Sequence, residues 1–587
     1  AASALIGILA ALRLDAAYQS AVASIASLVW PNNPLIGAYA SHLSVDLRLI
    51  VAVNIVVFAG VIRAPLARRV VVGLHALLFA VLVVLVDVVG CLAGAAMRLT
   101  NQAFAIVGSL LILAIAVLVV LRLLTTTFML PRPTAVPDRR VHHRSETWLL
   151  GIGVVLAMVT VVSLIDLVDT LFGLYHPTAF LVAFTGFPLL FDVMFGFLLF
   201  ATSPLRRRHP TGGSRPPLTT VTPAFNEEGT ITRTLEALDV AAGEYGGHVT
   251  VILVDDGSHD RTVEVASAAM ARFRYAEGRL VLAHHGGKAA ALNKGLALAK
   301  TEIVIRVDAD VVVATKALCF LPGWFVNPSV GMVGALALPD PRETTLYAKG
   351  RLFECLLGFA FARVALQRVD AVNCIPGTFT AFRAEPARRV GGFVSGMNGE
   401  DSDLTMQLGR LGYHVVVDTR IRTYEDVPGN LREFREQRVR WNRAGVHILA
   451  RHSPVVAGGG SPRTWFFYIR AATVRITAVL RPFVFLTGLE LSLLDPATRA
   501  VAPRVFVFYL VAALPTLAVI AVLAVRFGYG RKLGWLVVWF PFTLIRRMVA
   551  LEGLMTLPTR EVVPSLGRAR VHPPSLEPAV SATGIVP

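Results

Sequence analysis

Several segments of this sequence are apolar for long enough to cross a lipid bilayer. A hydrocarbon core about 30 Å thick needs roughly 20 such residues in a helix. The clearest segments are 70–97, 103–121, 148–165, 179–201 and 505–525. Across the 587 residues, apolar side chains make up 55% and charged ones only 16%, whereas average soluble chains carry about 25% charge. We therefore expect an integral membrane protein.

Other apolar segments are less clear. Segments 49–62 and 482–494 are short, and a proline interrupts 533–545. Residues 4–30 carry two charges and do not fit a cleavable signal peptide. We predict that 464–480, where arginines recur beside aromatic residues, is an interfacial amphipathic helix. The same assignment for 533–550 would leave the C-terminal tail in the cytoplasm.

The distribution of arginine among the loops sets the expected orientation. Arginines cluster after the segments 49–62, 103–121 and 179–201. The loops 31–46, 98–102 and 172–178 are nearly free of Lys and Arg. A five-span N-terminal bundle that ends in the cytoplasm fits every loop. The region from about 216 to 450 is then cytoplasmic.

Acidic residues lie in or near the apolar segments. They are Asp87, Asp166, Asp169, Asp192 and Glu490. A carboxylate is costly in lipid, so such residues often line a functional path. Packing between helices is an equally good explanation, and the sequence does not decide between the two.

The net charge of +17 does not indicate nucleic-acid binding. The basic residues sit beside apolar segments or in short linkers, and the sequence has no zinc-finger spacing. Attraction to anionic membrane lipids explains the excess better. The four cysteines form no CxxC pair, so we expect reduced thiols and neither a disulfide framework nor a cysteine metal site.

The central region has a different character, because short apolar strands alternate with amphipathic helices. Candidate strands are 218–222, 249–254, 279–283, 302–307, 331–337 and 414–418. Candidate helices are 229–241, 260–273, 288–300, 343–367, 401–411 and 430–451. This alternation predicts a largely parallel α/β sheet with helices on both faces. Ligands of such sheets bind beyond the carboxyl ends of the strands.

Acidic residues follow the first two predicted strands. Glu227 comes shortly after the first strand, and Asp255 and Asp256 end the second one before a glycine turn. Carboxylates at these positions face the ligand crevice. A solvated turn is an equally good explanation for the aspartate pair, since Asp, Gly and Ser all favour turns.

A third element is His285-Gly286-Gly287-Lys288, which precedes a predicted helix. Small residues, a lysine and a helix N-terminus can hold a phosphate. Taken alone, an ordinary helix start explains this stretch at least as well.

The strongest single element is Asp308-Ala309-Asp310 at the end of an apolar strand. Residues two apart in a strand lie on the same side. Paired carboxylates suit Mg²⁺ or Mn²⁺, which keep several waters and bind substrate phosphates. The alternative is two solvated acids at a strand end.

Two further elements lie on predicted helices. Glu400 and Asp401 begin one helix, where acids favour the N-terminus and where a catalytic base would also fit. Gln437, Arg440 and Trp441 share one face of the next helix. Gln and Arg can donate to a diphosphate and an indole can stack on a sugar ring, although a basic interfacial helix would look similar.

These elements, in this order, resemble the membrane-embedded branch of glycosyltransferase family 2. That branch includes cellulose, chitin, hyaluronan and poly-N-acetylglucosamine synthases. The resemblance covers residues 218–450 and rests on the aspartate pair, the DxD, the ED and the QxxRW. It implies an α/β GT-A (Rossmann-like) cytoplasmic domain inserted between N-terminal and C-terminal transmembrane helical bundles.

The resemblance also implies roles for the residues. Those implied to bind the nucleotide-sugar are Glu227, Asp255, Asp256, Lys288 and Asp308. Asp310, with Asp308, would hold Mg²⁺ or Mn²⁺. Asp401, beside Glu400, would be the general base, and it should ionise readily near a helix N-terminus. Gln437 and Arg440 would hold the diphosphate, and Trp441 would stack on the acceptor sugar.

The implied organisation has four parts. A membrane bundle over 1–205 precedes the catalytic domain over 216–450. Interfacial and membrane helices occupy 451–552, and 553–587 is a cytoplasmic tail. The apolar segments predict a multi-pass protein of the plasma membrane, and the excess of Arg over Lys with abundant Ala and Val hints at a bacterial source. An export partner protein is left open.

The function implied is inverting, metal-dependent transfer from a UDP-sugar to a growing polysaccharide, coupled to export. An alternative is non-processive transfer to a lipid acceptor, such as a polyprenyl phosphate or a glycolipid. A nucleotide-binding transporter or scaffold is a third hypothesis. The intact set of Asp310, Asp401 and Trp441 argues against it.

Overall fold

The computed structural model describes residues 14–43, 66–100, 147–172, 187–201, 214–372, 374–457 and 496–555, with scattered positions between 48 and 134 and between 464 and 474. Much of the predicted span 103–121, the segment 482–494 and the tail beyond 555 lie outside these residues. The predictions made for them stay predictions.

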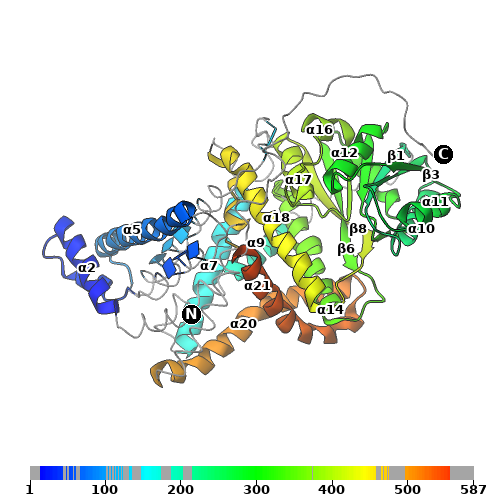
Figure 1. Cartoon of the computed structure of the whole chain (residues 1–587). Coiled ribbons are helices and arrows are strands. Elements are labelled where there is room, and N and C mark those ends of the chain that lie inside the picture. Colours follow the sequence, from blue (N-terminus) through cyan, green and yellow to red (C-terminus); the bar gives the residue numbers. More distant parts are fainter. Residues whose placement is uncertain are drawn as a thin grey trace.

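An eight-stranded sheet forms the centre of the catalytic region, on the right of Figure 1. Its order is β3-β2-β1-β4-β7-β6-β8-β5. The strands are β1 (Leu218–Ala224), β2 (Val249–Asp255), β3 (Glu277–Leu282), β4 (Ile303–Val307), β5 (Val311–Val313), β6 (Val330–Pro339), β7 (Phe379–Arg383) and β8 (His414–Glu425). All six predicted strands are present, while the short β5 and β7 were not predicted.

The sheet is mixed, which corrects the prediction of a largely parallel sheet. Strands β1, β2, β3 and β4 pair in parallel, as do β6 and β8. The unpredicted β7 runs antiparallel to both β4 and β6, and β5 runs antiparallel to β8. Inserting β7 between β4 and β6 therefore joins two parallel groups into one sheet.

Helices cover the sheet at all six predicted positions. They include α10 (Ile231–Tyr245), α11 (Thr262–Met270), α12 (Lys288–Leu298), α14 (Leu346–Cys355), α16 (Ala384–Arg389), α17 (Glu400–Arg410) and α18 (Leu431–Ala457). The short α16 was not predicted. The predicted helix 343–367 is interrupted after α14 by a π-helical segment, 356–363. Strands β1 and β2 are buried along their whole length, which explains their continuous apolar character.

Apolar helices flank this domain. They are α5 (Leu66–Met97), α7 (Thr147–Phe172), α9 (Phe187–Ala201), α20 (Pro496–Arg526) and α21 (Trp539–Met555). Among the described residues, two helical segments are long and apolar enough to cross a membrane, Arg69–Met97 and Gly530–Gly553. Shorter apolar helices lie within three other predicted spans. The five-span bundle therefore stays a prediction.

The C-terminal helix α21 packs directly on the catalytic domain. Its Phe542 contacts Phe434 of α18, with ring centroids 5.7 Å apart. It also sits so close to Gly350 of α14 that a Cβ there would overlap the Phe542 ring. In Figure 1, α21 accordingly lies beside α18 near the centre of the molecule. The segment that was ambiguous in the sequence is thus attached to the domain.

One acid of the apolar helices is paired. Asp87 of α5 is buried and forms a bidentate contact with Arg48, whose Nε and Nη2 lie 2.8 and 2.7 Å from its two oxygens. The Tyr18 hydroxyl, on α2 (Leu14–Val29), also donates to Asp87. Packing between helices accounts for this residue.

Close packing of α12 on the sheet yields a stability test. A Cβ on Gly295 would overlap Val221 of β1, so Gly295→Val should overpack this contact. We expect a loss of about 1–3 kcal/mol in the free energy of unfolding. Gly229→Val, at a position with open space, is the control. Thermal unfolding of the purified protein measures both, and equal stabilities would contradict the packing.

Candidate active site

A continuous cavity of about 2500 Å³ lies at the carboxyl edge of the sheet, between the sheet and α18. All of the predicted site residues except Asp255 line it: Glu227, Asp256, Lys288, Asp308, Asp310, Glu400, Asp401, Gln437, Arg440 and Trp441. Residues of α9, α20 and α21 line the same cavity. The structure thus gathers the separate sequence elements around one space.

Asp255 is buried beneath the surface of the cavity. One carboxylate oxygen, Oδ2, accepts from the backbone N–H groups of Gly257 and Ser258, each at 3.1 Å. This is the turn contact that the sequence allowed as an alternative. The other oxygen, Oδ1, is buried without a hydrogen-bond partner among the described residues. A buried carboxylate oxygen without a hydrogen bond lowers the stability of the folded protein unless a ligand donates to it.

Asp256 organises the glycine turn. Its two oxygens accept from the N–H groups of Gly286 and Gly287 at 2.9 and 2.8 Å. The His285 ring lies 3.0 Å from Oδ2. These donors at the start of α12 are therefore occupied by a carboxylate, and not by a phosphate, which the sequence had offered as one of two explanations.

Asp308 is held between two cations. Lys288 Nζ lies 2.7 Å from Oδ2, and Arg306 Nε lies 3.2 Å from Oδ1. Burial alone would raise the pKa of Asp308, but Lys288 and Arg306 outweigh it and lower this pKa below its ordinary value. Asp308 is therefore an ionised, fixed carboxylate.

Asp310 has the opposite environment. Burial, followed by the charge of Asp308, raises the pKa of Asp310 to about 6. No side chain of the described residues forms an ion pair with it. A carboxylate that lacks a cation and faces a cavity fits a divalent metal ion.

The donor set also fits this metal. Within the described part of the chain, no three His, Cys, Asp or Glu side chains converge to form a complete metal site. Mg²⁺ needs only one or two carboxylates when substrate phosphates and water complete its coordination. Asp310, with Asp308 beside it, satisfies that requirement.

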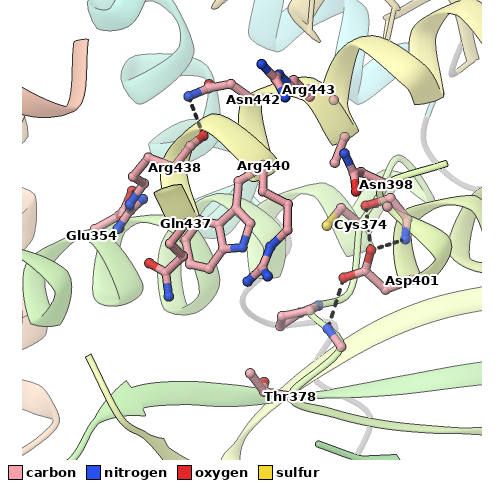
Figure 2. Close-up of a pocket in the computed structure, with 18 of the residues that line it drawn as sticks. Glu354, Cys374, Thr378, Asn398, Asp401, Gln437, Arg438, Arg440, Asn442 and Arg443 are labelled. Atoms are coloured by element: carbon pink, nitrogen blue, oxygen red, sulfur yellow. Dashed lines mark hydrogen bonds and ion pairs between the residues drawn. The ribbon is translucent and has the colours of Figure 1, made fainter. Parts of the chain in front are cut away.

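Glu400 and Asp401 begin α17 after Gly399, whose φ of 94° marks the turn into the helix. Arg306 Nη2 lies 2.9 Å from Glu400. Burial raises the pKa of Glu400, but Arg306 and Lys288 together with a backbone hydrogen bond outweigh it and lower this pKa. Asp401 Oδ2 accepts from the Gly377 N–H at 3.0 Å, and Oδ1 accepts from the Ser402 N–H at 2.7 Å. Figure 2 shows both contacts of Asp401.

The expectation that Asp401 ionises readily is wrong. Burial, followed by the neighbouring charge of Glu400, raises the pKa of Asp401 above its ordinary value. The charge of Arg306 and the hydrogen bond from Ser402 lower this pKa, but their effect is smaller than that of burial and Glu400. Position at a helix N-terminus is therefore a smaller effect here than desolvation.

Gln437, Arg440 and Trp441 share a face of α18, as their spacing predicted. Figure 2 shows Gln437 and Arg440 projecting from this helix into the space that Asp401 also faces. Trp441 has two cationic neighbours: the Cζ atoms of Arg438 and Arg351 lie 4.5 and 4.9 Å from its ring centroid.

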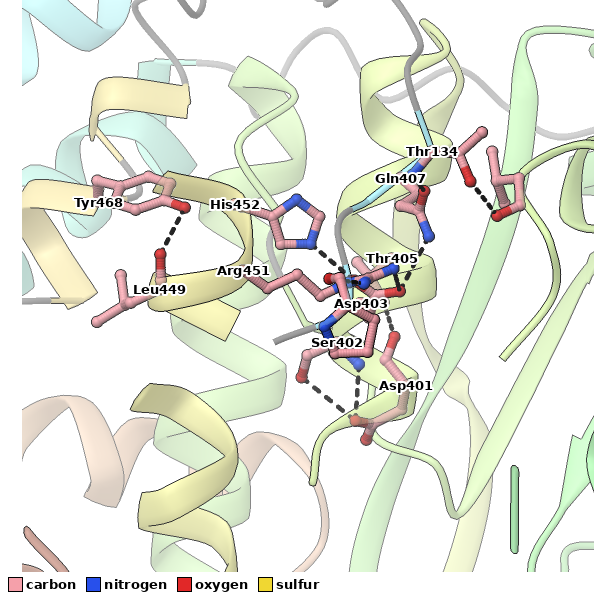
Figure 3. Close-up of polar contacts among 12 residues, drawn as sticks. Thr134, Asp401, Ser402, Asp403, Thr405, Gln407, Leu449, Arg451, His452 and Tyr468 are labelled. Carbon is pink, nitrogen blue, oxygen red and sulfur yellow. Dashed lines mark hydrogen bonds and ion pairs between the residues drawn. The ribbon is translucent and has the colours of Figure 1, made fainter. Parts of the chain in front are cut away.

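A buried cluster connects α17 to α18 (Figure 3). Asp403, which is fully buried, lies 2.6 Å from Arg451 Nε and 2.8 Å from His452 Nε2. It also accepts from Gln407 at 2.9 Å, and Gln407 in turn accepts from the Thr134 N–H at 3.2 Å. The helix that begins with Asp401 is thereby tied to the helix that carries Trp441.

Several site residues were not identified from the sequence. Arg306 had a signal, because a charged residue stands in a buried apolar strand. Arg438 lies inside the QxxRW element. Nothing in the local sequence marks Arg351, Glu354 or Glu425, since each is defined by a partner far along the chain.

The cavity continues into the apolar helices. There it is lined by Phe191 and Asp192 of α9, Leu510 and Thr516 of α20, and Leu544 of α21. Thr516 donates to Asp192 at 2.5 Å, so this carboxylate has a partner on a different helix. This end of the cavity therefore combines apolar side chains with the Thr516–Asp192 pair and with Arg470, whose Cζ lies 6.0 Å from the Phe191 ring centroid.

Comparison with known proteins agrees with this arrangement. Residues 219–391 match the sequence profile of glycosyl transferase family 2. The poly-β-1,6-N-acetyl-D-glucosamine synthase of Staphylococcus epidermidis is 28% identical over 233 residues, which cover 39% of this chain and 54% of that protein. The probable glycosyltransferase YdaM of Bacillus subtilis is 26% identical over 238 residues, covering 40% and 56%. This chain spans about half the length of these curated relatives.

A solved structure is also similar. The mannosyltransferase PcManGT from Pyrobaculum calidifontis, in complex with GDP-Man and Mn²⁺, is 20% identical. The match covers 60% of this chain and 98% of that chain, with a TM-score of 0.41. The mixed sheet and the family match together give the central region a GT-A-like glycosyltransferase fold.

The Asp403 cluster yields a second stability test. Asp403→Asn removes the charge that compensates buried Arg451, so we expect a loss of about 3–5 kcal/mol in the free energy of unfolding. Glu264→Gln, which breaks an exposed ion pair with Arg261, should leave it nearly unchanged. Denaturant unfolding in detergent measures both, and similar stabilities would show that the buried cluster is not needed.

Proposed function

Because this chain carries a glycosyltransferase domain of family 2, we propose that it transfers a sugar from a UDP-sugar to a growing polysaccharide at a bacterial membrane. The observation that carries the proposal is the single cavity that joins the carboxylates at the sheet edge, Asp401 and the QxxRW helix. The similarity to poly-N-acetylglucosamine synthases supports a polysaccharide product.

The donor would bind at the sheet edge. The buried, unpartnered Oδ1 of Asp255 suits an N–H group of a nucleobase. Asp256 keeps the glycine turn in place, and Lys288 lies beside Asp308 where a diphosphate would enter. Gln437 and Arg440 would donate to that diphosphate from the opposite side of the cavity.

Asp310, with Asp308, would hold Mg²⁺ or Mn²⁺. When bound, the ion would offset the negative charge that develops on the departing diphosphate. Arg440 would contribute to the same end from α18, because a fixed cation near developing charge lowers the barrier.

Asp401 would be the general base of an inverting displacement. Its carboxylate takes the proton of the acceptor hydroxyl while that oxygen bonds to the anomeric carbon and the bond to the diphosphate breaks. A pKa raised above its ordinary value makes Asp401 a stronger proton acceptor than an exposed aspartate. The hydrogen bonds from Gly377 and Ser402 would hold the carboxylate in place.

Transfer to a lipid acceptor is the second candidate. The apolar lining from α9, α20 and α21 favours it, since a lipid tail would fit where the cavity enters these helices. Export of the product, the span count and a partner protein for export remain parts of the proposal that only the intact membrane protein can test.

Replacing the base tests the chemistry. Asp401→Asn should lower transfer from the preferred UDP-sugar by about 10²–10⁴-fold, because no base then takes the proton of the acceptor hydroxyl. Purified protein in lipid, with Mg²⁺ or Mn²⁺ and a panel of labelled UDP-sugars, provides the assay, and Glu264→Gln is the control. Long polymer supports the polysaccharide synthase, and a short lipid-extractable product supports the second candidate. Full activity of Asp401→Asn would contradict the assignment.

Removing the metal tests Asp310. Chelation with EDTA should abolish transfer, and Mn²⁺ should restore it. In Asp310→Asn we expect a loss of at least roughly 100-fold that added metal does not rescue, because several kcal/mol of charge stabilisation are lost. Binding of UDP with and without Mn²⁺ is the second readout. If Mn²⁺ strengthens UDP binding equally in both proteins, Asp310 does not hold the ion.

A further inference from the structure

One carboxylate, Glu354 of α14, receives guanidinium groups from three different helical elements. Arg438 of α18 binds it in a bidentate way, with both nitrogen–oxygen distances at 2.7 Å. Arg351 of α14 lies at 2.9 Å and Arg546 of α21 at 2.7 Å. Figure 2 shows Glu354 facing Arg438 at the edge of the pocket. A bidentate contact fixes both the distance and the orientation of a guanidinium.

Two of these arginines contact Trp441. The Cζ atoms of Arg438 and Arg351 lie 4.5 and 4.9 Å from the indole centroid, within the range of cation–π attraction. Because Glu354 fixes both guanidinium groups, it also fixes the cations that hold the indole. The position of Trp441 in the cavity therefore depends on Glu354, which lies far earlier in the sequence.

The same network reaches the side of the cavity where Asp310 lies. Arg351 Nε donates to Glu425 at 2.7 Å, while its Nη1 donates to Glu354. Glu425 ends β8 and pairs with Val311, the residue after Asp310. Arg351 thus connects the strand beside the proposed metal residue to the acceptor side.

The contacts of Glu354 also extend to α21. Arg546 extends from this helix to Glu354, and Phe542 of the same helix packs against Phe434 of α18. The α21 helix belongs to one of the two described segments that are long and apolar enough to cross a membrane. A helix of this kind is thereby attached to the indole by a chain of charged contacts.

The charges make Glu354 the critical member. Among the described residues, Glu354 is the acidic partner of both Arg438 and Arg546, whereas Arg351 also has Glu425. Without Glu354, two arginines would lose their carboxylate and would repel each other across a largely buried space. Removal should therefore displace the arginines that hold Trp441 without touching the donor residues.

We propose that Glu354 is a positioning residue for the acceptor site. Through Arg438 and Arg351 it sets where Trp441 holds the acceptor sugar relative to Asp401, and through Arg546 it ties that position to α21. This inference rests on the proposed function, in which Trp441 stacks on the acceptor. None of the network residues contacts the reacting atoms, so the effect falls on the acceptor and not on bond breaking.

The experiment separates acceptor use from donor use. The acceptor is the shortest β-1,6-linked N-acetylglucosamine oligosaccharide that the wild-type protein extends, and UDP release without acceptor reports donor turnover. In Glu354→Gln we expect the KM for acceptor to rise about tenfold, the scale of one lost cation–π contact. Donor KM and UDP release without acceptor should stay within about twofold. Glu354→Asp, which keeps the charge, should recover part of the acceptor affinity.

Arg546→Gln covers the case in which Glu354→Gln fails to fold, because it leaves Glu354 paired with Arg438 and Arg351. We expect a smaller rise in acceptor KM in the same direction. Arg435→Gln is the matched control, since exposed Arg435 joins the same two helices through half-buried Glu552, with Nε at 2.7 Å, and has no cation–π contact with Trp441 among the described residues. It should leave both KM values unchanged.

Several outcomes would overturn the proposal. An unchanged acceptor KM in both Glu354→Gln and Arg546→Gln would remove the positioning role. Equal effects on donor and acceptor, or an equal effect in Arg435→Gln, would mean that the network only holds the helices together. If the wild-type protein extends no oligosaccharide with any UDP-sugar, the proposed polysaccharide synthesis fails and this inference fails with it.

Discussion

A single buried guanidinium connects the two halves of the site. Arg306 of β4 is 2% exposed, and it contacts Asp308 at 3.2 Å on one side and Glu400 at 2.9 Å on the other. It also packs closely on Gly377, where an added Cβ would overlap Nη2 and would displace the guanidinium. Since a buried cation needs anionic partners, the sheet edge and the start of α17 must stay together for Arg306 to remain buried. The residues proposed to bind the donor and to act as the base are therefore placed by one compensated charge.

Much of the fold could be predicted because it is encoded locally. The six predicted strands are runs of apolar residues, and the periodicity of the helices marks which face is buried. Strands β5 and β7 were missed because β5 has three residues and β7 is recognisable only by its antiparallel partners, β4 and β6. For the same reason the parallel sheet that the alternation predicted is a mixed one. Local pattern does not report which strand inserts between two others.

The candidate site divides in the same way. Residues with an acidic or aromatic signature in a short element, such as Asp310 and Trp441, were identified from the sequence, and both line the cavity. Glu354 and Asp403 were not given a role, because most of their arginine partners are distant in sequence. Arg451 lies 48 residues from Asp403, and Arg546 lies 192 residues from Glu354. Ion pairs of that separation leave no trace in a window of neighbouring residues. The supporting network of a site is thus less predictable than the site itself.

The pKa values of the neighbouring Glu400 and Asp401 shift in opposite directions, because Arg306 contacts only Glu400 directly. Arg306 contacts Glu400 and lowers its pKa, which fixes a negative charge beside Asp401. That charge, together with burial, raises the pKa of Asp401. The sign of the resulting pH dependence follows. A base with a raised pKa becomes protonated at a higher pH than an ordinary aspartate, so acidification removes its basic form earlier. In return its carboxylate accepts a proton more readily above that pKa. Burial and the charge of Glu400 produce this rise, while the charge of Arg306 itself acts to lower the pKa of Asp401.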